Sequence, residues 1–196
     1  YDLAWKCIRL KNLDNMIVAI DFGITNTDVA LSNKSQYKFF SIPSKNANES
    51  FIDEIISLID IDITEISQIV VTGGKSNELD ESYKGVNLTK ISETDAIGYG
   101  TKEIYKIEND PFITLSCGTG TACIYHQDGQ FSYIGGIAVG GGTISGLSKA
   151  ILDSSSLKEI TDLALKGNRK NIDLLIGDVV NEIGILNSNV TASNFA

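Results

Sequence analysis

Residues 16–42 read MIVAIDFGITNTDVALSNKSQYKFFSI, and this stretch decides the fold. The apolar run at 16–21 is short and rich in β-branched residues, which is typical of a buried strand. Two further strand-like segments follow it, separated by a turn at 22–27 and a polar turn at 33–36. The pattern therefore predicts a three-stranded meander with tight connections.

The same order of elements returns in residues 112–134, which read FITLSCGTGTACIYHQDGQFSYI. Gly23 and Gly118 head the corresponding first turns of the two stretches. Repetition on this scale predicts two related domains rather than a solenoid. A chance likeness between two ordinary meanders is the alternative.

Composition bounds the class of protein. The chain has 196 residues, of which 42% are hydrophobic and 21% charged, and only two are proline, so it is not a disordered or proline-rich chain. The formal net charge is −9 without a basic cluster, which argues against a nucleic-acid partner. No apolar run approaches the roughly 20 residues of a membrane span, and no signal-peptide pattern opens the chain, so we expect a cytoplasmic protein without a membrane partner.

The numbers and spacing of cysteine and histidine argue against several kinds of metal and catalytic site. Three cysteines without metal-ligand spacing predict neither a disulfide framework nor a zinc site. His126 is the single histidine, which makes a Ser-His-Asp triad or a histidine-based metal site improbable. With Arg9 and Arg169 as its two arginines, a chain that handles an anion must use backbone amides, helix N-termini or lysine.

We expect three parts along the chain: an extension at 1–15 ahead of Met16, a first domain at 16–110 and a partial second domain at 111–196. The last residues, NSNVTASNFA, contain no closing strand, so we interpret the chain as a fragment. Its second half should then be the more loosely packed, because an open sheet leaves an apolar face uncovered.

Helical periodicity appears outside the two meanders. Apolar residues recur at helical spacing in 49–60, 94–107, 156–166 and 171–180, and each segment predicts a helix. A further helix should begin near Gly141 or Thr143. A strand is expected at 66–71, ending at the turn TGGKS.

Asp21 stands at the end of the first predicted strand, just before the turn Phe22-Gly23-Ile24-Thr25. A carboxylate at the end of a buried strand is costly unless it pairs or meets a cation, and Mg²⁺ prefers one or two carboxylates together with phosphate oxygens. Glycine lets the backbone approach a ligand closely. The alternative is an ordinary hairpin in which Asp21 bonds its own turn.

Two further glycine-rich segments suit an anion. Gly118-Thr119-Gly120-Thr121 occupies the matching turn of the second meander, and two such turns facing each other across a cleft would cradle a polyphosphate. Gly140 to Thr143 opens a helix, whose first amides attract anions, although glycine needed for close packing is the alternative. Neither segment fits the Walker pattern or the dinucleotide-binding pattern.

Glu93 follows Ser92 in the first turn of the helix expected at 94–107. Acidic residues are favoured there by the helix dipole, and Ser92 is a good cap. Periodicity alone therefore does not single out Glu93 as catalytic.

Taken together, several motifs resemble the type II pantothenate kinases, which belong to the actin-like ATPase superfamily that also contains acetate and sugar kinases. The resemblance covers roughly residues 16–196. The segments that carry it are DFGIT, TGGKS, ISETDAIGYG, LSCGTGTACIY and IGGIAVGGGTISGLSKAIL.

The resemblance implies an α/β fold of two ribonuclease-H-like domains with ATP and Mg²⁺ between them. It implies transfer of the γ-phosphate of ATP to the primary hydroxyl of pantothenate, the first step of coenzyme A synthesis, by a homodimeric enzyme. Glu93 aligns with the family's general base. Asp21 would hold the metal.

The resemblance also implies a nucleotide site. Its residues are Asp21, Phe22, Gly23, Ile24, Thr25, Asn26, Thr27, Asp28, Thr119, Gly141, Gly142, Thr143, Ile144 and Ser145.

Three positions depart from the family pattern. Ile24 stands where the family has glycine, Asp28 where it has lysine, and Tyr133 where it has an arginine that holds the substrate. Tyr133 is thus our candidate for substrate contact. The departures leave two alternatives open: a kinase-like nucleotide-binding module without pantothenate kinase activity, or a kinase of another small hydroxylated substrate.

Overall fold

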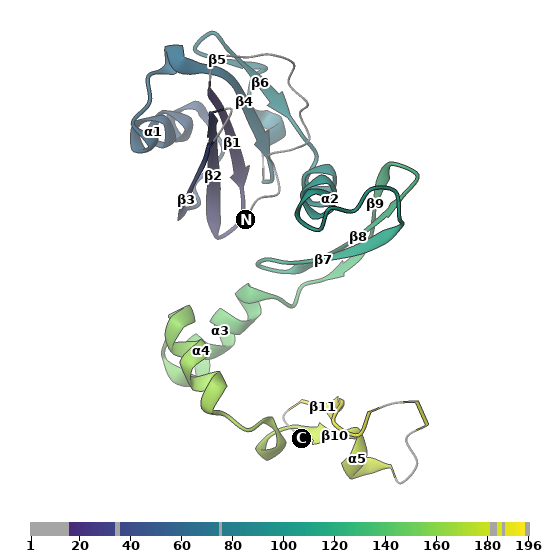
Figure 1. Ribbon diagram of the computed structural model, residues 1–196. Coiled ribbons are helices and arrows are strands. Elements are labelled where there is room, and N and C mark those ends of the chain that lie inside the picture. Colours follow the sequence, from purple (N-terminus) through teal and green to yellow (C-terminus); the bar gives the residue numbers. More distant parts are fainter. Residues whose placement is uncertain (1–15, 34–35, 75, 181–183, 186, 195–196) are drawn as a thin grey trace. The chain divides into compact units, whose positions relative to one another are not determined.

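The computed structural model describes residues 16–33, 36–74, 76–180, 184–185 and 187–194 (Figure 1). The extension expected at 1–15 lies outside these residues. The chain forms two compact units, one through Thr143 and one from Ile144 onward, and each is described by itself.

A six-stranded mixed sheet forms the first part of the chain. Its strand order is β3-β2-β1-β4-β6-β5, with β1 antiparallel to β2 and parallel to β4. This is ribonuclease-H-like topology, and the expected α/β fold with a ribonuclease-H-like first domain is confirmed. The strands are β1 (Met16–Phe22), β2 (Asn26–Asn33), β3 (Gln36–Pro43), β4 (Ile66–Thr72), β5 (Ser82–Tyr83) and β6 (Val86–Lys90).

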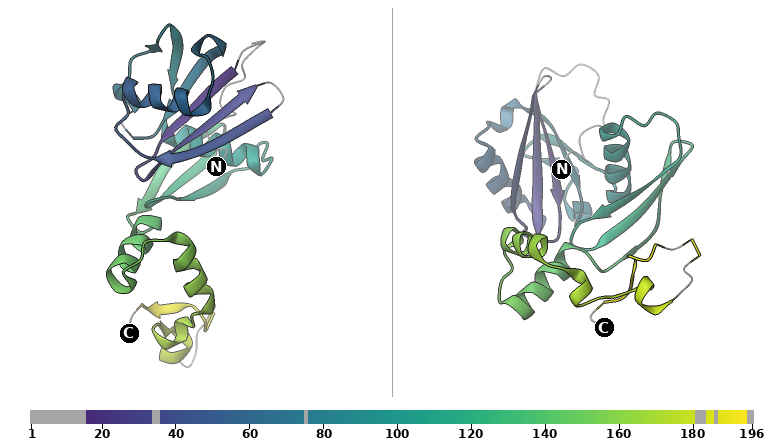
Figure 2. Two further views of the ribbon diagram at one scale, coloured as in Figure 1. Left: turned by 90° about the vertical axis from the view of Figure 1, so that its left-hand side faces the viewer. Right: turned by 60° about the horizontal axis from the view of Figure 1, so that its bottom comes forward.

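Helix α1 (Glu49–Ile59) covers one face of this sheet (Figures 1 and 2). It begins at Asn48, whose side chain accepts a hydrogen bond of 2.9 Å from the amide of Phe51. Its buried side chains include Ile52 and Ile55, which are fully enclosed with Ile20 of β1. Burying each such isoleucine contributes about 1.5–3 kcal/mol. The helix expected at 49–60 is therefore confirmed.

The opposite face of the same sheet is lined by small and polar residues near its end. Alternation along β1 places Val18 and Ile20 toward α1, so Asp21 belongs to the other face. Asp21 pairs in register with Asp28 of β2 and with Thr72 of β4. Three polar side chains therefore lie side by side across three strands.

The second meander is also confirmed. It consists of β7 (Phe112–Cys117), β8 (Thr121–Gln127) and β9 (Gln130–Ile137), all antiparallel. Helix α2 (Glu93–Ile104) packs on one face of this sheet, where the hydroxyl of Thr114 donates to that of Thr101 at 3.0 Å. The helix was expected at 94–107 and ends earlier.

An aromatic cluster fills the contact between α2 and the second sheet. The ring of Tyr99 meets Phe131 edge-on at 4.7 Å, and the buried ring of His126 stacks on Phe112 at 4.6 Å. A Cβ on Gly98 would lie only 2.1 Å from the Phe131 ring. Glycine at this position therefore allows the helix to approach the sheet closely.

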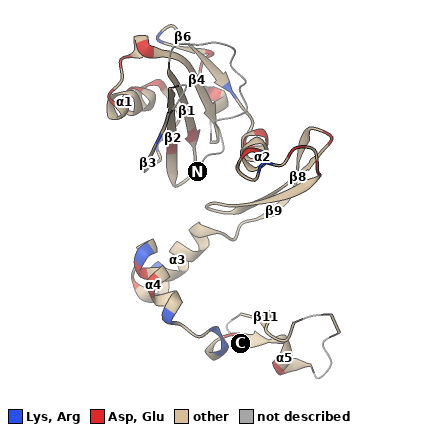
Figure 3. Ribbon diagram, viewed as in Figure 1, with Lys and Arg blue, Asp and Glu red and all other residues tan. Residues whose placement is uncertain are grey.

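The outer face of the second sheet is apolar and exposed. Ile113, Leu115 and Ile137 are each about 60% exposed. Asp128 is the single charged residue between 111 and 148, and Figure 3 shows β8 and β9 largely without charge. Of the described residues after 111, only Ile124, His126 and Leu175 are buried, which agrees with the looser packing expected of the second half.

The remaining elements follow β9. Helix α3 (Gly141–Leu152) begins where expected, and the helix expected at 156–166 is confirmed as α4 (Leu157–Lys166), which Ser156 caps. The helix expected at 171–180 is wrong: this stretch holds β10 (Leu174–Leu175) and only a short α5 (Ile176–Val179), because Leu174 and Leu175 pair with β11 (Thr191–Ser193). Short 3-10 turns occupy Ile63–Glu65, Ser76–Glu78 and Arg169–Asn171.

None of the helices in the described part of the chain has both the length and the apolar character that a membrane span requires.

Candidate functional site

Asp21 lies where the parallel strands β1 and β4 end together. The turn after β4 passes directly behind its carboxylate. Gly73 has a φ of +73°, and a Cβ added there would lie 2.3 Å from Oδ1 of Asp21 and 2.9 Å from the carbonyl oxygen of Phe22. Glycine is therefore required by both conformation and space, and it fixes the position of Asp21.

The surroundings of Asp21 disfavour the ionised form of its carboxyl group. Burial, followed by the negative charges of Glu93 and Asp28, raises its pKa from 3.8 to about 6. Within the described part of the chain, which leaves out Lys75, no residue forms an ion pair with Asp21. An uncompensated carboxylate of this kind favours a cation beside it.

The first glycine turn, defined as residues 23–27, links β1 to β2 and includes the first two residues of β2. The amide of Gly23 donates to the carbonyl of Asp21 at 3.0 Å, which closes the turn tightly. The Phe22 side chain points into the core, where its ring packs against Phe51, so only its backbone faces the turn. Ile24 is 82% exposed at the tip.

The second glycine turn, Gly118 to Gly120, meets the first one. The hydroxyls of Thr25 and Thr119 are 3.0 Å apart and hydrogen-bonded. The structure thus brings together the two turns that the sequence analysis paired.

The glycine segment that opens α3 packs against this second turn. The amide of Gly141 donates to the carbonyl of Gly118 at 2.8 Å, and that of Gly142 to the carbonyl of Thr119 at 3.0 Å. A Cβ on Gly140 would lie 2.6 Å from the Thr119 carbonyl oxygen. These glycines therefore serve close packing, and two of the amides expected to face an anion bond to the protein instead.

The rest of that segment adds two observations. Thr143 caps its own helix: its hydroxyl donates to the carbonyl of Ala138 at 3.1 Å and accepts from the amide of Gly140 at 3.3 Å. Ile144 and Ser145 belong to the second compact unit.

Glu93 is the first residue of α2, and it is exposed. Ser92 caps the helix by accepting from the amide of Asp95 at 3.0 Å, and its hydroxyl donates to the Asp95 carboxylate at 2.7 Å. Because Asp95 is engaged in this cap, Glu93 is the carboxylate at the helix start whose charge acts on Asp21. Periodicity alone could not show this electrostatic effect on Asp21, and the role of Glu93 as a base stays a prediction.

Tyr133 lies on β9, directly opposite Ile124 of β8. Residues directly opposite in an antiparallel pair share a face, so Tyr133 belongs to the face on which α2 packs. A bulge follows it, because the register shifts between Cys123 and Ile124. The side chain is 61% exposed and thus accessible to a ligand.

Two residues near the site were not found from the sequence. Ser44, just after β3, bonds the first glycine turn at several points. Thr72 is buried beside Asp21, and its hydroxyl lacks a hydrogen-bond partner among the described residues. Pro43 indicates the end of β3 in the sequence. The sequence does not show, however, that the next residue, Ser44, bonds Gly23 and Thr25.

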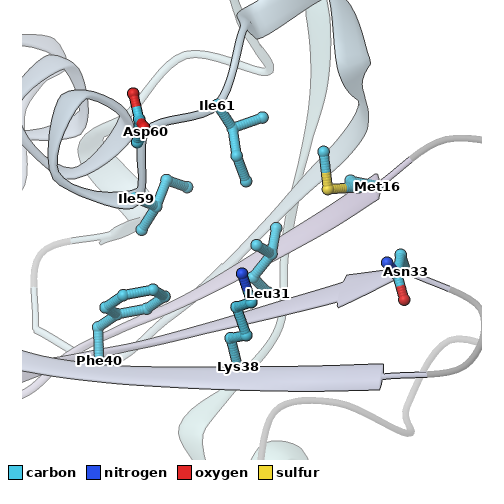
Figure 4. Close-up of a pocket in the computed structure, with 8 residues that line it drawn as sticks. All are labelled: Met16, Leu31, Asn33, Lys38, Phe40, Ile59, Asp60 and Ile61. Atoms are coloured by element: carbon cyan, nitrogen blue, oxygen red, sulfur yellow. The ribbon is translucent and has the colours of Figure 1, made fainter.

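A pocket of about 390 Å³ lies at the other end of the first sheet (Figure 4). Its walls include Met16, at the start of β1, together with Phe40 and Ile59. Asp21 lies five residues further along an extended strand, so this pocket is separate from the candidate site.

The described residues contain no group of three or more His, Cys, Asp or Glu side chains poised to hold a metal. Asp21 alone, half-buried and without a cationic partner among those residues, fits an ion that takes its remaining ligands from phosphate and water.

These features define the class: an actin-like fold of ribonuclease H topology, with two glycine turns joined beside a pair of carboxylates. A family model described as Fumble matches residues 75–196, and the chain belongs to this family.

Its relatives include proteins named type II pantothenate kinase. The one from Bacillus anthracis is 35% identical over 186 residues, covering 91% of this chain and 64% of the relative. One from Bacillus cereus is 34% identical over 183 residues, covering 91% of this chain and 65% of the relative. The chain thus spans about two thirds of the length of these relatives.

Among solved structures, a ROK family protein from Streptococcus pneumoniae in complex with sucrose aligns with a TM-score of 0.48 and 14% identity. The alignment covers 78% of this chain and 68% of that one.

Proposed function

We propose that this chain carries the phosphotransfer site of a pantothenate kinase, which transfers the γ-phosphate of ATP to the primary hydroxyl of pantothenate in the first step of coenzyme A synthesis. The observation that carries the proposal is the hydrogen bond between Thr25 and Thr119, which joins the two glycine turns, together with Asp21 at the end of β1, whose pKa the charge of Glu93 helps to raise. Membership of the Fumble family and the names of the relatives support it.

Glu93 is the proposed general base. Its carboxylate at the start of α2 is exposed and forms no hydrogen bond or ion pair with the described residues, so it is free to accept a proton from a substrate hydroxyl. The hydroxyl proton passes to this carboxylate as the hydroxyl oxygen attacks the γ-phosphorus and the bond to the ADP oxygen breaks. Phosphoryl transfer depends mainly on positioning and charge stabilisation, which suits a site built of turns and few side chains.

Asp21 is the proposed ligand of Mg²⁺, which would neutralise charge on the phosphates when bound. The remaining residues would position the nucleotide. They are the turn residues 22–28, Thr119, and residues 141–145 at the start of α3; at Gly141 and Gly142 the contribution is structural, since their amides bond the second turn.

The domain arrangement and the assembly of the protein are also proposed. We place the start of a second ribonuclease-H-like domain at residue 111, because β7, β8 and β9 repeat the order of β1, β2 and β3. We further propose a cytoplasmic homodimer.

The test is Glu93→Gln, with the exposed Glu108→Gln as the matched control. General-base catalysis contributes about 10²–10⁴-fold, so Glu93→Gln should lower kcat for pantothenate-dependent ADP release by that order. The Kd for ATP should stay within about twofold, since the base does not hold the nucleotide. Equal turnover in the two variants would remove Glu93 from the role.

A kinase of another small hydroxylated substrate is the second candidate, and Tyr133 favours it. The accessible phenol at this position cannot form the bidentate contact with a carboxylate that arginine makes. A screen of hydroxylated acceptors for ADP release decides between the substrates. ATP binding without turnover on any acceptor would instead indicate a nucleotide-binding module.

A further inference from the structure

Ser44 bonds the first glycine turn at its start, middle and end. Its hydroxyl donates to the carbonyl of Gly23, and its amide donates to the carbonyl of Thr25 at 3.1 Å. Its Oγ is 3.0 Å from the hydroxyl of Thr27. One residue outside the turn therefore holds three of the turn's five residues.

The direction of the third bond follows from the proton count. A serine hydroxyl has one proton to donate and two lone pairs to accept with. Since the proton of Ser44 goes to Gly23, the hydroxyl of Thr27 must donate to Ser44. Thr27 is fully buried, so its hydroxyl would be left without this partner if Ser44 lost its oxygen.

These bonds also orient two peptide groups. In a planar trans peptide the carbonyl of one residue and the amide of the next point in opposite directions. The carbonyls of Gly23 and Thr25 point at Ser44. The amides of Ile24 and Asn26 therefore point away from Ser44 and from the end of β3.

We propose that Ser44 is a positioning residue for the phosphate turn: it fixes the 23–27 backbone so that the amides of Ile24 and Asn26 are presented to the phosphates of a bound nucleotide. Ser44 does not itself touch the nucleotide. The inference rests on the proposed nucleotide site and adds to it a residue that acts through the turn's conformation.

The experiment compares three variants of the whole chain. Ser44→Ala removes the hydroxyl, Ser44→Thr keeps it, and Ser50→Ala removes an exposed hydroxyl on α1 as the matched control. ATP affinity is measured by calorimetry, and amide hydrogen exchange is followed at residues 23–28 without nucleotide. Urea midpoints show whether each variant is folded at the assay temperature.

Ser44→Ala should weaken ATP binding about tenfold, as the loss of the bonds that hold the turn predicts. It should also speed exchange in residues 23–28, while Ser44→Thr and Ser50→Ala keep the parent's values. If Ser44→Ala binds ATP as the parent does, or if its exchange at 23–28 is unchanged, the inference fails and the proposed function stands. If the parent itself does not bind ATP, the proposed function fails, and the inference with it.

Discussion

Replacing Asp21 by asparagine should stabilise the protein without nucleotide, although it removes the proposed metal ligand. The carboxyl has a pKa of about 6 in the folded protein, compared with 3.8 for an ordinary aspartate. Each pKa unit corresponds to about 1.4 kcal/mol, so ionised Asp21 lowers the free energy of unfolding by at most about 3 kcal/mol. Because the group is only half-buried, solvent screening reduces the expected gain to about 1–2 kcal/mol.

The sign of the pH dependence follows from the raised pKa. Between pH 3.8 and 6 the folded state binds more protons at Asp21 than the unfolded state does, so the wild-type protein loses stability as pH rises through this window. The advantage of Asp21→Asn should thus be small near pH 4 and complete above about pH 7. Urea unfolding at pH 4, 5, 6 and 7.5 measures it.

Asp62→Asn is the control with the opposite sign. The backbone amide and hydroxyl of Thr64 hold the pKa of Asp62 below its usual range, so its ionised form stabilises the fold at neutral pH. That variant should gain nothing as pH rises. A constant difference between Asp21→Asn and wild type from pH 4 to 7.5 would refute the reasoning, as would a loss of stability at neutral pH.

Two further substitutions probe the packing around the site. His126→Leu should raise the free energy of unfolding by about 1–2 kcal/mol, because both ring nitrogens of His126 are buried without a partner among the described residues. A lower urea midpoint in the variant than in the wild type would contradict this. Gly140→Ala should lower stability by about 1–3 kcal/mol and weaken ATP binding, because its Cβ would collide with the carbonyl of Thr119. Gly146→Ala is the control, because a Cβ added there would meet nothing within 4 Å. It should be neutral or stabilising in urea unfolding and calorimetry.

Elements held by local patterns could be predicted from the sequence. The meander strands follow from apolar runs broken by turn residues, and Asp21 is conspicuous as a charge at the end of such a run. The prediction of a helix at 171–180 was wrong because Leu174 and Leu175 pair with β11, further along the chain. Periodicity within a segment contains no information about such a distant strand.

The site residues divide in the same way. Thr25 and Thr119 could be paired because two turns of similar composition repeat along the chain. Thr72 and Ser44 could not be predicted as site residues. Thr72 lies beside Asp21 because of the register between β4 and β1, and Ser44 bonds Gly23, which is 21 residues away in the sequence. For Glu93, local rules favoured an ordinary acidic residue in a first helical turn, and only the position of Asp21 distinguishes it.

Helix α2 and the residues ahead of it connect the two sheets. The amide of Ile91, ahead of the helix, donates to the carbonyl of Val71 in the first sheet at 2.9 Å, whereas the body of α2 bonds the second sheet through Thr101 and Thr114. The backbone therefore passes from the first sheet to the second at Ser92 and Glu93. Asp21 lies on the first sheet and Thr119 on the turn of the second, where its hydroxyl bonds that of Thr25. The candidate site is thus built from both sheets, and a change that displaces either sheet would disturb it without altering any of its residues.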